Sequence, residues 1–516
     1  MKREEMKKRF WEEHPFLLKA KIMDLYTGGK PIIVLNEKDA LSKDIYPLYR
    51  VEMIFRNERM VSIVDLSKEL VSSGEVGLPR EVAERFGINE GDYVEIRHMP
   101  RPKSIEYIRK KLDGRSLDKP EMYEIIRDVV DDRLSEGELG AFVAAMYIRG
   151  LDDNEVVYLT QSLVETGDTL DLNVEPIVDK HCIGGVANNR TTMLVVPIIA
   201  AAGVYIPKTS SRAITSAAGT ADTVEVLAPV ALKIDELREV VLKTHGAMVW
   251  GGAMNLATAD DKLIRIRHPL SLDPRGVLLA SILAKKKSVG AQHVIIDIPI
   301  GRGAKVEDAS VAEDLAQDFI KIGKRLGMNI VALMTDGSEP IGAGVGPALE
   351  ARDVLKILDG DGPQDLKEKS IVLAGRLLEM AGKVPEGRGQ SVAREILDSG
   401  KAKDKFWEII EAQGGQRRKP DDLPIGQYTY DVEASQDGKI HHIHNKYVAR
   451  IARAAGSPFD KGAGLYLHVK KGDRVKKGDV LFTIYAESET KLDYAVKSLD
   501  IWNPIEMKKI VFGEFR

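Results

Sequence analysis

Short apolar runs near the start of the chain predict β-strands at positions 20–23, 32–35 and 61–64. Pro79 suits the first position of a helix, and Gly87 suits its end. A Gly-Asp turn at 91–92 then leads to a fourth strand at 93–96. The pattern predicts a small β-barrel with one short helix over residues 1–100, with a structural or assembly role.

Helical spacing replaces the strand pattern after a Pro-rich linker at 99–102. Apolar residues at 122, 125, 126 and 129 share one helix face, and Ser135 with Glu138 has the spacing of a capping box. A third helix begins near Asp152 and ends at Gly167. We expect a helical domain over residues 101–175, joined by about 260–288.

Apolar strands followed by polar loops dominate residues 176–423. They lie at 177–178, 204–206, 294–298 and 329–334, and helical patterns separate them. This alternation predicts an α/β fold with a mostly parallel sheet covered on both faces, in which ligands bind at the carboxyl ends of the strands. Strand patterns at 427–432, 465–469 and 480–484 then predict a C-terminal α+β domain over 424–516, with a packing role.

Composition restricts the class of protein. The chain has 516 residues, of which 44% are hydrophobic and 30% charged, and its formal net charge of −4 argues against a nucleic-acid binder. A single cysteine, Cys182, excludes an intramolecular disulfide and fits a reducing cytoplasm. The charged N-terminus is unlike a signal peptide, and no apolar run is long enough for a membrane span. We expect a cytoplasmic protein with no membrane partner.

Two polar loops carry the candidate chemistry, at 179–186 and 208–220, with an apolar run at 193–202 between them. Paired glycines, hydroxyls, a lysine and an arginine are groups that bind oxyanions, above all phosphate. A capped helix start would also explain the first loop, and a surface linker would explain the composition of the second. The second loop favours anion binding because it follows a buried strand.

The sequence DKHCIGG at 179–185 resembles the DKHSTGG loop of thymidine and pyrimidine-nucleoside phosphorylases, and SSRAITSAAGTAD at 210–222 resembles the second loop of their AMP phosphorylase branch. The resemblance covers nearly the whole chain. It implies phosphorolysis of nucleoside 5′-monophosphates (AMP, or CMP and UMP) to free base and ribose 1,5-bisphosphate. It implies inorganic phosphate as co-substrate, no cofactor, no metal, and a homodimer or higher homo-oligomer.

The resemblance also implies roles for individual residues. The positions that match the site of the attacking phosphate are Lys180, Thr191, Ser210 and Thr220. The positions that match AMP-binding residues are Gly185, Ser211, Arg212, Ala213, Ile214, Thr215, Ser216 and Thr220. Ser281 and Lys305 match further substrate-binding positions, and Asp273 matches the proton donor to the leaving base. Lys285 is either a base-binding lysine or an exposed helix lysine, and His181 either contacts the base or packs.

Two positions depart from the family pattern. Cys182 stands where many relatives have a phosphate-binding serine, and a thiol is a weaker donor than a hydroxyl. Asn188 stands where relatives usually have glycine, and asparagine is the next most tolerant residue if a positive φ is needed. Alternative functions are a thymidine or pyrimidine-nucleoside phosphorylase, a nucleotide-binding regulator without turnover, and a phosphoribosyltransferase.

Overall fold

The computed structural model describes residues 16–28, 31–99, 102–213, 216–254, 256–270 and 272–508. Its contacts divide the chain into two compact units, which are Met1–Gly150 with Lys262–Asp273, and Leu151–Asp261 with Pro274–Arg516.

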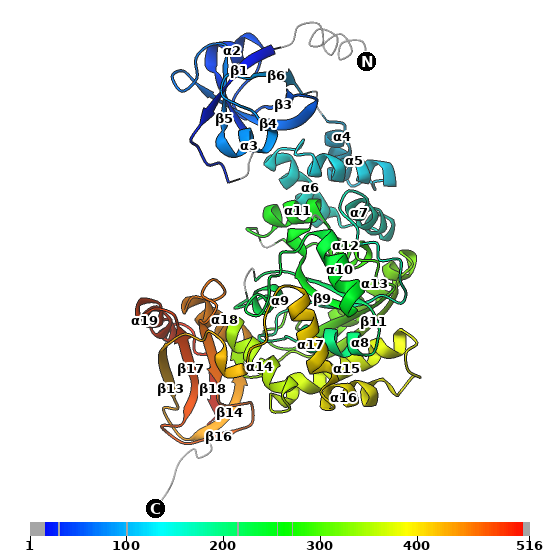
Figure 1. Ribbon diagram of the computed structural model, residues 1–516, viewed down its shortest axis with the longest axis vertical. Coiled ribbons are helices and arrows are strands. Elements are labelled where there is room, and N and C mark those ends of the chain that lie inside the picture. The colour runs from blue at the N-terminus through cyan, green and yellow to red at the C-terminus, as the bar shows by residue number, and fades with distance from the viewer. Residues whose placement is uncertain are drawn as a thin grey trace, which may run out of the picture. The chain divides into compact units, whose positions relative to one another are not determined.

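Six strands of the first unit close into a barrel in the order β1-β5-β2-β4-β3-β6 (Figure 1). Their bounds are β1 Phe16–Met23, β2 Ile32–Asn36, β3 Arg50–Phe55, β4 Glu58–Ser67, β5 Glu75–Pro79 and β6 Tyr93–His98. Alternate side chains of these strands fill an apolar core, as β3 shows with Val51, Met53 and Phe55. Two short helices complete it, α2 Glu37–Ser42 and α3 Arg80–Phe86. The predicted barrel is confirmed, although β3, β5 and α2 were not predicted.

Three helices follow the barrel in the first unit, α4 Ser104–Leu112, α5 Lys119–Val130 and α6 Glu136–Arg149. Asp118 and Ser135 form capping boxes at the starts of α5 and α6. Backbone N–H groups that lack a partner within the helix are therefore hydrogen-bonded at the N-terminus of each of these two helices. The predicted apolar face of α5 is buried at Met122 and Ile125. The helix α11, Thr258–Arg267, enters this unit at Lys262.

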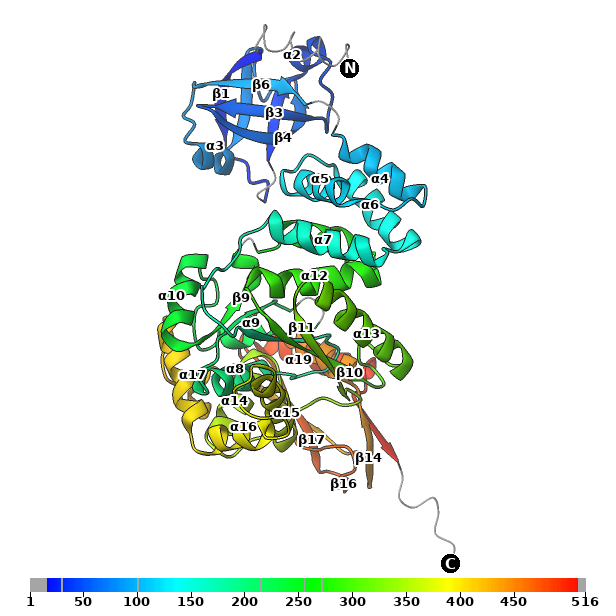
Figure 2. The ribbon, with the colours of Figure 1, turned by 90° about the vertical axis from the view of Figure 1, so that its right-hand side faces the viewer.

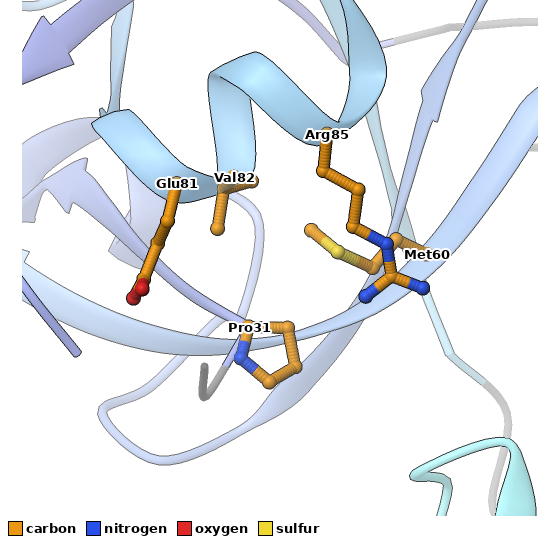
Figure 3. Close-up of a pocket in the computed structure, with 5 residues that line it drawn as sticks. All are labelled: Pro31, Met60, Glu81, Val82 and Arg85. Carbon is orange, nitrogen blue, oxygen red and sulfur yellow. The ribbon is translucent and has the colours of Figure 1, made fainter. Parts of the chain in front are cut away.

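A hollow in the barrel lies between α3 and the neighbouring strands (Figure 3). Its lining residues are Pro31, Met60, Glu81, Val82 and Arg85. Figure 3 shows Glu81 and Arg85 on the same helix at opposite sides of the hollow. This lining contains one acid, one base and no Ser/Thr/Gly-rich loop, so it lacks the groups predicted for phosphate chemistry.

A parallel sheet forms the centre of the second unit. Its strands are β7 Val178–Cys182, β8 Ile206–Ser210, β9 Gly246–Trp250, β10 His293–Ile300 and β11 Asn329–Asp336. All pairings are parallel, and a parallel bridge between Ile177 and Tyr205 joins β7 to β8. The strand order is therefore β9-β8-β7-β10-β11. This confirms the predicted α/β fold with a mostly parallel sheet.

Helices cover both faces of this sheet, with α13 against β10 and β11 and α8 against β8 and β9 (Figure 2). The first four residues of α11 belong to this unit. The other α-helices of the unit before residue 413 are α7 Asp153–Glu165, α8 Thr192–Ala201, α9 Thr220–Val224, α10 Ile234–Thr244, α12 Arg275–Ser288, α13 Ala309–Arg325, α14 Pro347–Leu358, α15 Gln364–Met380, α16 Gly389–Asp398 and α17 Lys401–Ala412. The apolar run at 193–202 lies almost entirely in α8, which is buried along nearly its whole length. Its apolar side chains belong to a core that also includes residues of α14, α15 and α17.

Two small sheets and two helices form the C-terminal part of the second unit. One sheet has the order β12-β15-β17-β13, with bounds Gly344–Val345, Gly464–Leu467, Val480–Ala486 and Tyr428–Glu433. The other has the order β16-β14-β18, with bounds Arg474–Val475, Gly438–Ile443 and Ile505–Lys508. Helices α18 Asn445–Ala454 and α19 Glu489–Lys497 pack on the first sheet. The predicted α+β character is confirmed.

The predicted division into four domains stays a prediction. Residues 262–273 group with the first unit, whereas α12 packs on α7 within the second. Across the ranges that the structure describes, no helix has both the length and the apolar character needed to cross a membrane.

Candidate active site

The strand order creates a switch point between β7 and β10. The chain moves from β7 outward to β8 and β9, and then returns to the other side of β7 as β10. In open α/β sheets the loops after two such strands diverge, and the position at their carboxyl ends, which we call the crevice, is where ligands bind. The loop 183–190 follows β7, and the loop 301–306 follows β10. Both predicted anion-binding segments therefore belong to elements at or beside this crevice.

The first motif is a strand for half its length. We expected a polar loop from Asp179, but β7 runs through Cys182 and pairs with β10 from Val178 to Cys182. The backbone hydrogen bonds to the apolar strand β10 stabilise an extended conformation here, although the side chains of the motif are polar. The loop itself begins at Ile183. Lys180 therefore projects from rigid backbone rather than from a flexible loop.

Lys180 and Thr191 form the centre of the predicted phosphate site. The ammonium of Lys180 is 2% exposed and donates to the hydroxyl of Thr191, the N-cap residue of α8. Burial lowers the pKa of Lys180, since the charged form loses hydration. The structure thus brings two predicted phosphate residues into direct contact.

Asp297 is a charged residue of this cluster that sequence analysis missed. It lies opposite Cys182 on β10, is fully buried, and accepts from Thr335 at 2.6 Å and from Asn189 at 3.2 Å. Lys369 of α15 forms an ion pair with it at 3.1 Å. Burial acts to raise the pKa of Asp297, but Lys369 and Lys180 overcome that effect and hold it below its ordinary value. The sequence feature that could have identified Asp297 is an acidic residue inside the apolar run 294–298.

Cys182 is held as a neutral thiol. Its sulfur accepts from the amide of Asn189 at 3.1 Å. Burial first, and then the charge of Asp297, raise the pKa of the Cys182 thiol to about 12. The group is therefore protonated at neutral pH, in agreement with the weak-donor role expected for it.

Asn188 adopts the conformation suggested by its place in the motif. Its φ is +56°, in the region where asparagine is the most tolerant residue after glycine. Its side chain donates to Asp353 at 2.7 Å, and Asp353 also accepts from the backbone of Gly344 at 2.8 Å. The turn is thereby anchored to the middle of α14 and, through Asp353, to the backbone of Gly344.

Gly185 and Lys305 lie against each other at the start of the crevice. A Cβ placed on Gly185 would stand 2.2 Å from the backbone nitrogen of Lys305, and Gly185 has a φ of +92°. Only glycine permits this approach. Two predicted substrate-binding positions, 120 residues apart in sequence (305 − 185), are thus in backbone contact.

The second loop begins at Ser210, the last residue of β8. The bridge between Ile177 and Tyr205 places the start of β8 beside the start of β7, so Ser210 ends the strand next to the first motif. Among the described residues, the buried hydroxyl of Ser210 has no hydrogen-bond partner. A ligand oxygen would satisfy it, as buried polar groups require.

Arg190 connects the two loops. Its guanidinium donates to Glu350 at 2.5 Å, to the carbonyl of Ala218 at 2.5 Å, and to the hydroxyl of Thr220 at 3.1 Å. Burial raises the pKa of Glu350, while Arg190 acts to lower it. The predicted phosphate residue Thr220 is therefore oriented from the first loop by a residue that sequence analysis did not select.

Arg212 faces acids of its own chain. It donates to Glu225 at 2.5 Å and to Asp222 at 3.1 Å, and its guanidinium lies 4.8 Å from the Trp250 ring centroid. Asp222 also accepts from the backbone of Ala213 at 2.7 Å. These contacts shape the loop around Asp222.

The remaining predicted residues of the second loop have simpler surroundings. The Ser216 hydroxyl donates to the carbonyl of Ala218 at 3.0 Å, and the Ser211 carbonyl accepts from Ala221 at 3.4 Å. Ile214 and Thr215 lie outside the described residues.

Ser281 and Lys285 meet at one buried carboxylate. Both lie on α12 and donate to Asp260, at 2.6 Å and 2.7 Å. Lys285 is therefore not a free surface lysine, because it is paired with an acid that is 1% exposed. Asp260 was not predicted as a site residue, because it lies in no motif that the sequence makes recognisable.

His181 lies among lysines. Burial lowers its pKa well below the ordinary value, and Lys286, Lys208, Lys285 and Lys180 add to the effect. The imidazole is neutral at physiological pH and is able to accept as well as donate a hydrogen bond. Its position links the Lys180 side of the crevice to the Lys285 side.

A buried carboxylate beneath the site holds two further lysines. Asp179 is paired with Lys286 at 2.6 Å and with Lys208 at 3.6 Å, and all three are at most 5% exposed. Burial lowers the pKa of Lys208 to about 7, with Asp179 opposing that effect. The surroundings of the crevice are therefore rich in positive charge.

Asp273 lies in the first compact unit, where it is paired with Arg267. Its role as proton donor stays a prediction.

The family comparisons agree with this architecture. Residues 105–167 match the glycosyl transferase family helical bundle domain, and residues 174–403 match the a/b domain of that family. Residues 439–506 match the pyrimidine nucleoside phosphorylase C-terminal domain.

Relatives that match over nearly the whole chain identify the family more closely. The chain is 49% identical to AMP phosphorylase of Pyrococcus furiosus over 497 residues, which cover 96% of this chain and 98% of the relative. The chain belongs to the AMP phosphorylase family. A second member of the family, AMP phosphorylase 1 of Archaeoglobus fulgidus, is 47% identical, with 94% of this chain and 96% of the relative covered.

One solved structure shares the fold. Anthranilate phosphoribosyltransferase of Thermus thermophilus aligns with a TM-score of 0.51 at 19% identity. The alignment covers 60% of this chain and 99% of that one. At this identity the likeness concerns architecture alone.

Proposed function

We propose that this protein splits nucleoside 5′-monophosphates with inorganic phosphate, giving a free base and ribose 1,5-bisphosphate. The observation that carries the proposal is the buried pair of Lys180 and Thr191, together with the Ser210 hydroxyl at the end of β8, which has no hydrogen-bond partner among the described residues. These groups suit one phosphate. In this proposal the described residues of the adjoining loop, 211–213 and 216–219, bind the 5′-phosphate.

In the proposed reaction, a phosphate oxygen forms a bond to C1′ of the ribose while the bond from C1′ to the base nitrogen breaks. Lys180 stabilises the phosphate and fixes it below C1′. Asp273 supplies the proton to the departing base, acting as a general acid. In this proposal His181, a neutral imidazole, contacts the edge of the base.

The test is phosphate-dependent base release from AMP, CMP and UMP, measured beside adenosine, uridine and thymidine. We expect turnover of the 5′-monophosphates only, with phosphate required and pyrophosphate inactive. Turnover of the free nucleosides alone would overturn the proposal in favour of a thymidine-type phosphorylase. AMP binding without base release would indicate a regulator.

Assembly and location form part of the same proposal. The similarity to the family supports a cytoplasmic homodimer or higher homo-oligomer that acts on small molecules, with no nucleic-acid or membrane partner. Light scattering coupled to gel filtration measures the mass directly, and a monomer of 57.0 kDa would contradict the oligomer.

A further inference from the structure

Asn445 is a buried residue of the C-terminal part that contacts two loops of the crevice. It begins α18 and is 3% exposed. Its amide oxygen accepts from the backbone N–H of Ala187 at 2.9 Å, and its amide nitrogen donates to the carbonyl of Gly337 at 3.0 Å. One bond needs an acceptor and the other a donor, and the amide of Asn445 supplies both, whereas a carboxylate only accepts and an ammonium only donates.

These two bonds complete a closed series of contacts among three loops. The first loop, 183–188, touches the third loop, 301–306, where Gly185 meets the backbone of Lys305. The third loop touches the fourth loop, 337–342, where a Cβ on Gly301 would stand 2.6 Å from the nitrogen of Ser338. Asn445 then joins the fourth loop back to the first.

The C-terminal part also holds the fourth loop at a second point. Glu339 accepts from the backbone of Ile443 at 2.6 Å and contacts His442 at 2.7 Å. The fourth loop is thus hydrogen-bonded to β14 through Glu339. Asn445 binds both this loop and Ala187 of the first loop, so it restricts the movement of one loop relative to the other. A hydrogen bond from Ile341 to the carbonyl of Ala187 at 3.2 Å supports the same junction.

We propose that Asn445 is a positioning residue for the nucleotide half of the site, an inference that rests on the proposed function. The series of contacts contains Gly185 and Lys305, which are the predicted nucleotide-binding positions. It leaves out Lys180 and Thr191, which project from β7 and the start of α8. Loss of Asn445 therefore disturbs nucleotide binding and leaves phosphate binding intact.

The first measurement is steady-state kinetics of Asn445→Ala, with His441→Ala as control because His441 is exposed on β14 of the same domain. We expect the KM for AMP to rise about tenfold through the loss of two hydrogen bonds, while the KM for phosphate stays within about twofold. A merely structural role would lower the active fraction without changing either KM. Equal changes in both KM values, or none, would overturn the inference.

The second measurement needs no activity. Amide hydrogen exchange should accelerate in segments 183–188 and 337–342 of Asn445→Ala and stay unchanged in His441→Ala. In Asn445→Asp the carboxylate still accepts from Ala187 but cannot donate to Gly337, so only 337–342 should accelerate. Unchanged exchange in both segments would overturn the role of Asn445. If the wild-type protein releases no base from AMP, the proposed function fails and this measurement still decides the inference.

Discussion

Replacement of Gly185 by alanine tests whether backbone contact between the first and third loops shapes the site. The new Cβ would stand 2.2 Å from the nitrogen of Lys305 and 2.8 Å from the carbonyl carbon of Ala304. Both are backbone atoms, so no side-chain rotation relieves the contact. Gly184 provides a matched control, because its φ is also positive, at +102°, and a Cβ there meets nothing within 4 Å.

The magnitude follows from the geometry. Ordinary van der Waals contact begins at 3.4 Å, so the two loops must separate by 1.2 Å (3.4 − 2.2). A displacement of about 1 Å between groups that bind the same substrate costs roughly 10²-fold in rate. Backbone strain from a positive φ costs on the order of 1–3 kcal/mol, and both variants carry it.

The assay compares kcat/KM for AMP phosphorolysis with the free energy of unfolding in urea. Both variants should lose stability through the positive φ, and Gly185→Ala should lose more because it adds the backbone clash. We expect Gly185→Ala alone to lose about 10²-fold in kcat/KM. Equal activity losses in the two variants would refute the reasoning, because strain would then explain everything. Wild-type activity in Gly185→Ala would show that the loops separate without consequence.

Three other predictions concern single side chains. Cys182→Ser should lower the KM for phosphate about 2–10-fold, because a hydroxyl donates a stronger hydrogen bond; a raised KM would contradict this. Since the pKa of the Cys182 thiol is raised to about 12, alkylation of the native protein should be slow at pH 8 and rise about tenfold per pH unit above it, followed by mass spectrometry; a plateau near pH 9 would contradict that pKa. Asp273→Asn should lower kcat by about 10²–10⁴ with little change in KM, and unchanged turnover would remove Asp273 from the mechanism.

Local patterns in the sequence predicted much of the fold. The capping boxes at Ser135 and Asp152 place α6 and α7, because they depend on residues only three positions apart. The φ of Asn188 is positive, a conformation that the sequence allowed for but did not require at this position. Alternation of apolar strands and helices indicated the parallel sheet.

Long-range partners could not be predicted in the same way. Arg190 is paired with Glu350, 160 residues away, and no local rule connects them. An arginine such as Arg212 is a typical anion-binding residue, but in the folded chain its guanidinium donates to the carboxylates of Asp222 and Glu225. The strand character of residues 179–182 also depends on pairing with β10, which lies more than 100 residues later. Such features arise only when the chain is folded.

The two-residue strand β12 has a consequence for how the chain is made. It precedes α14, yet it pairs with β15 at Tyr466 and Leu465, and Val345 and Ala217 belong to the apolar core of the C-terminal part. A ribosome releases these residues long before their partners exist. Until residues 464–486 are synthesised, the nascent chain exposes an unpaired strand edge and an apolar surface, the features that promote aggregation. A fragment ending at residue 423 would keep both permanently, so the C-terminal part acts as a built-in cover for the rest of the unit.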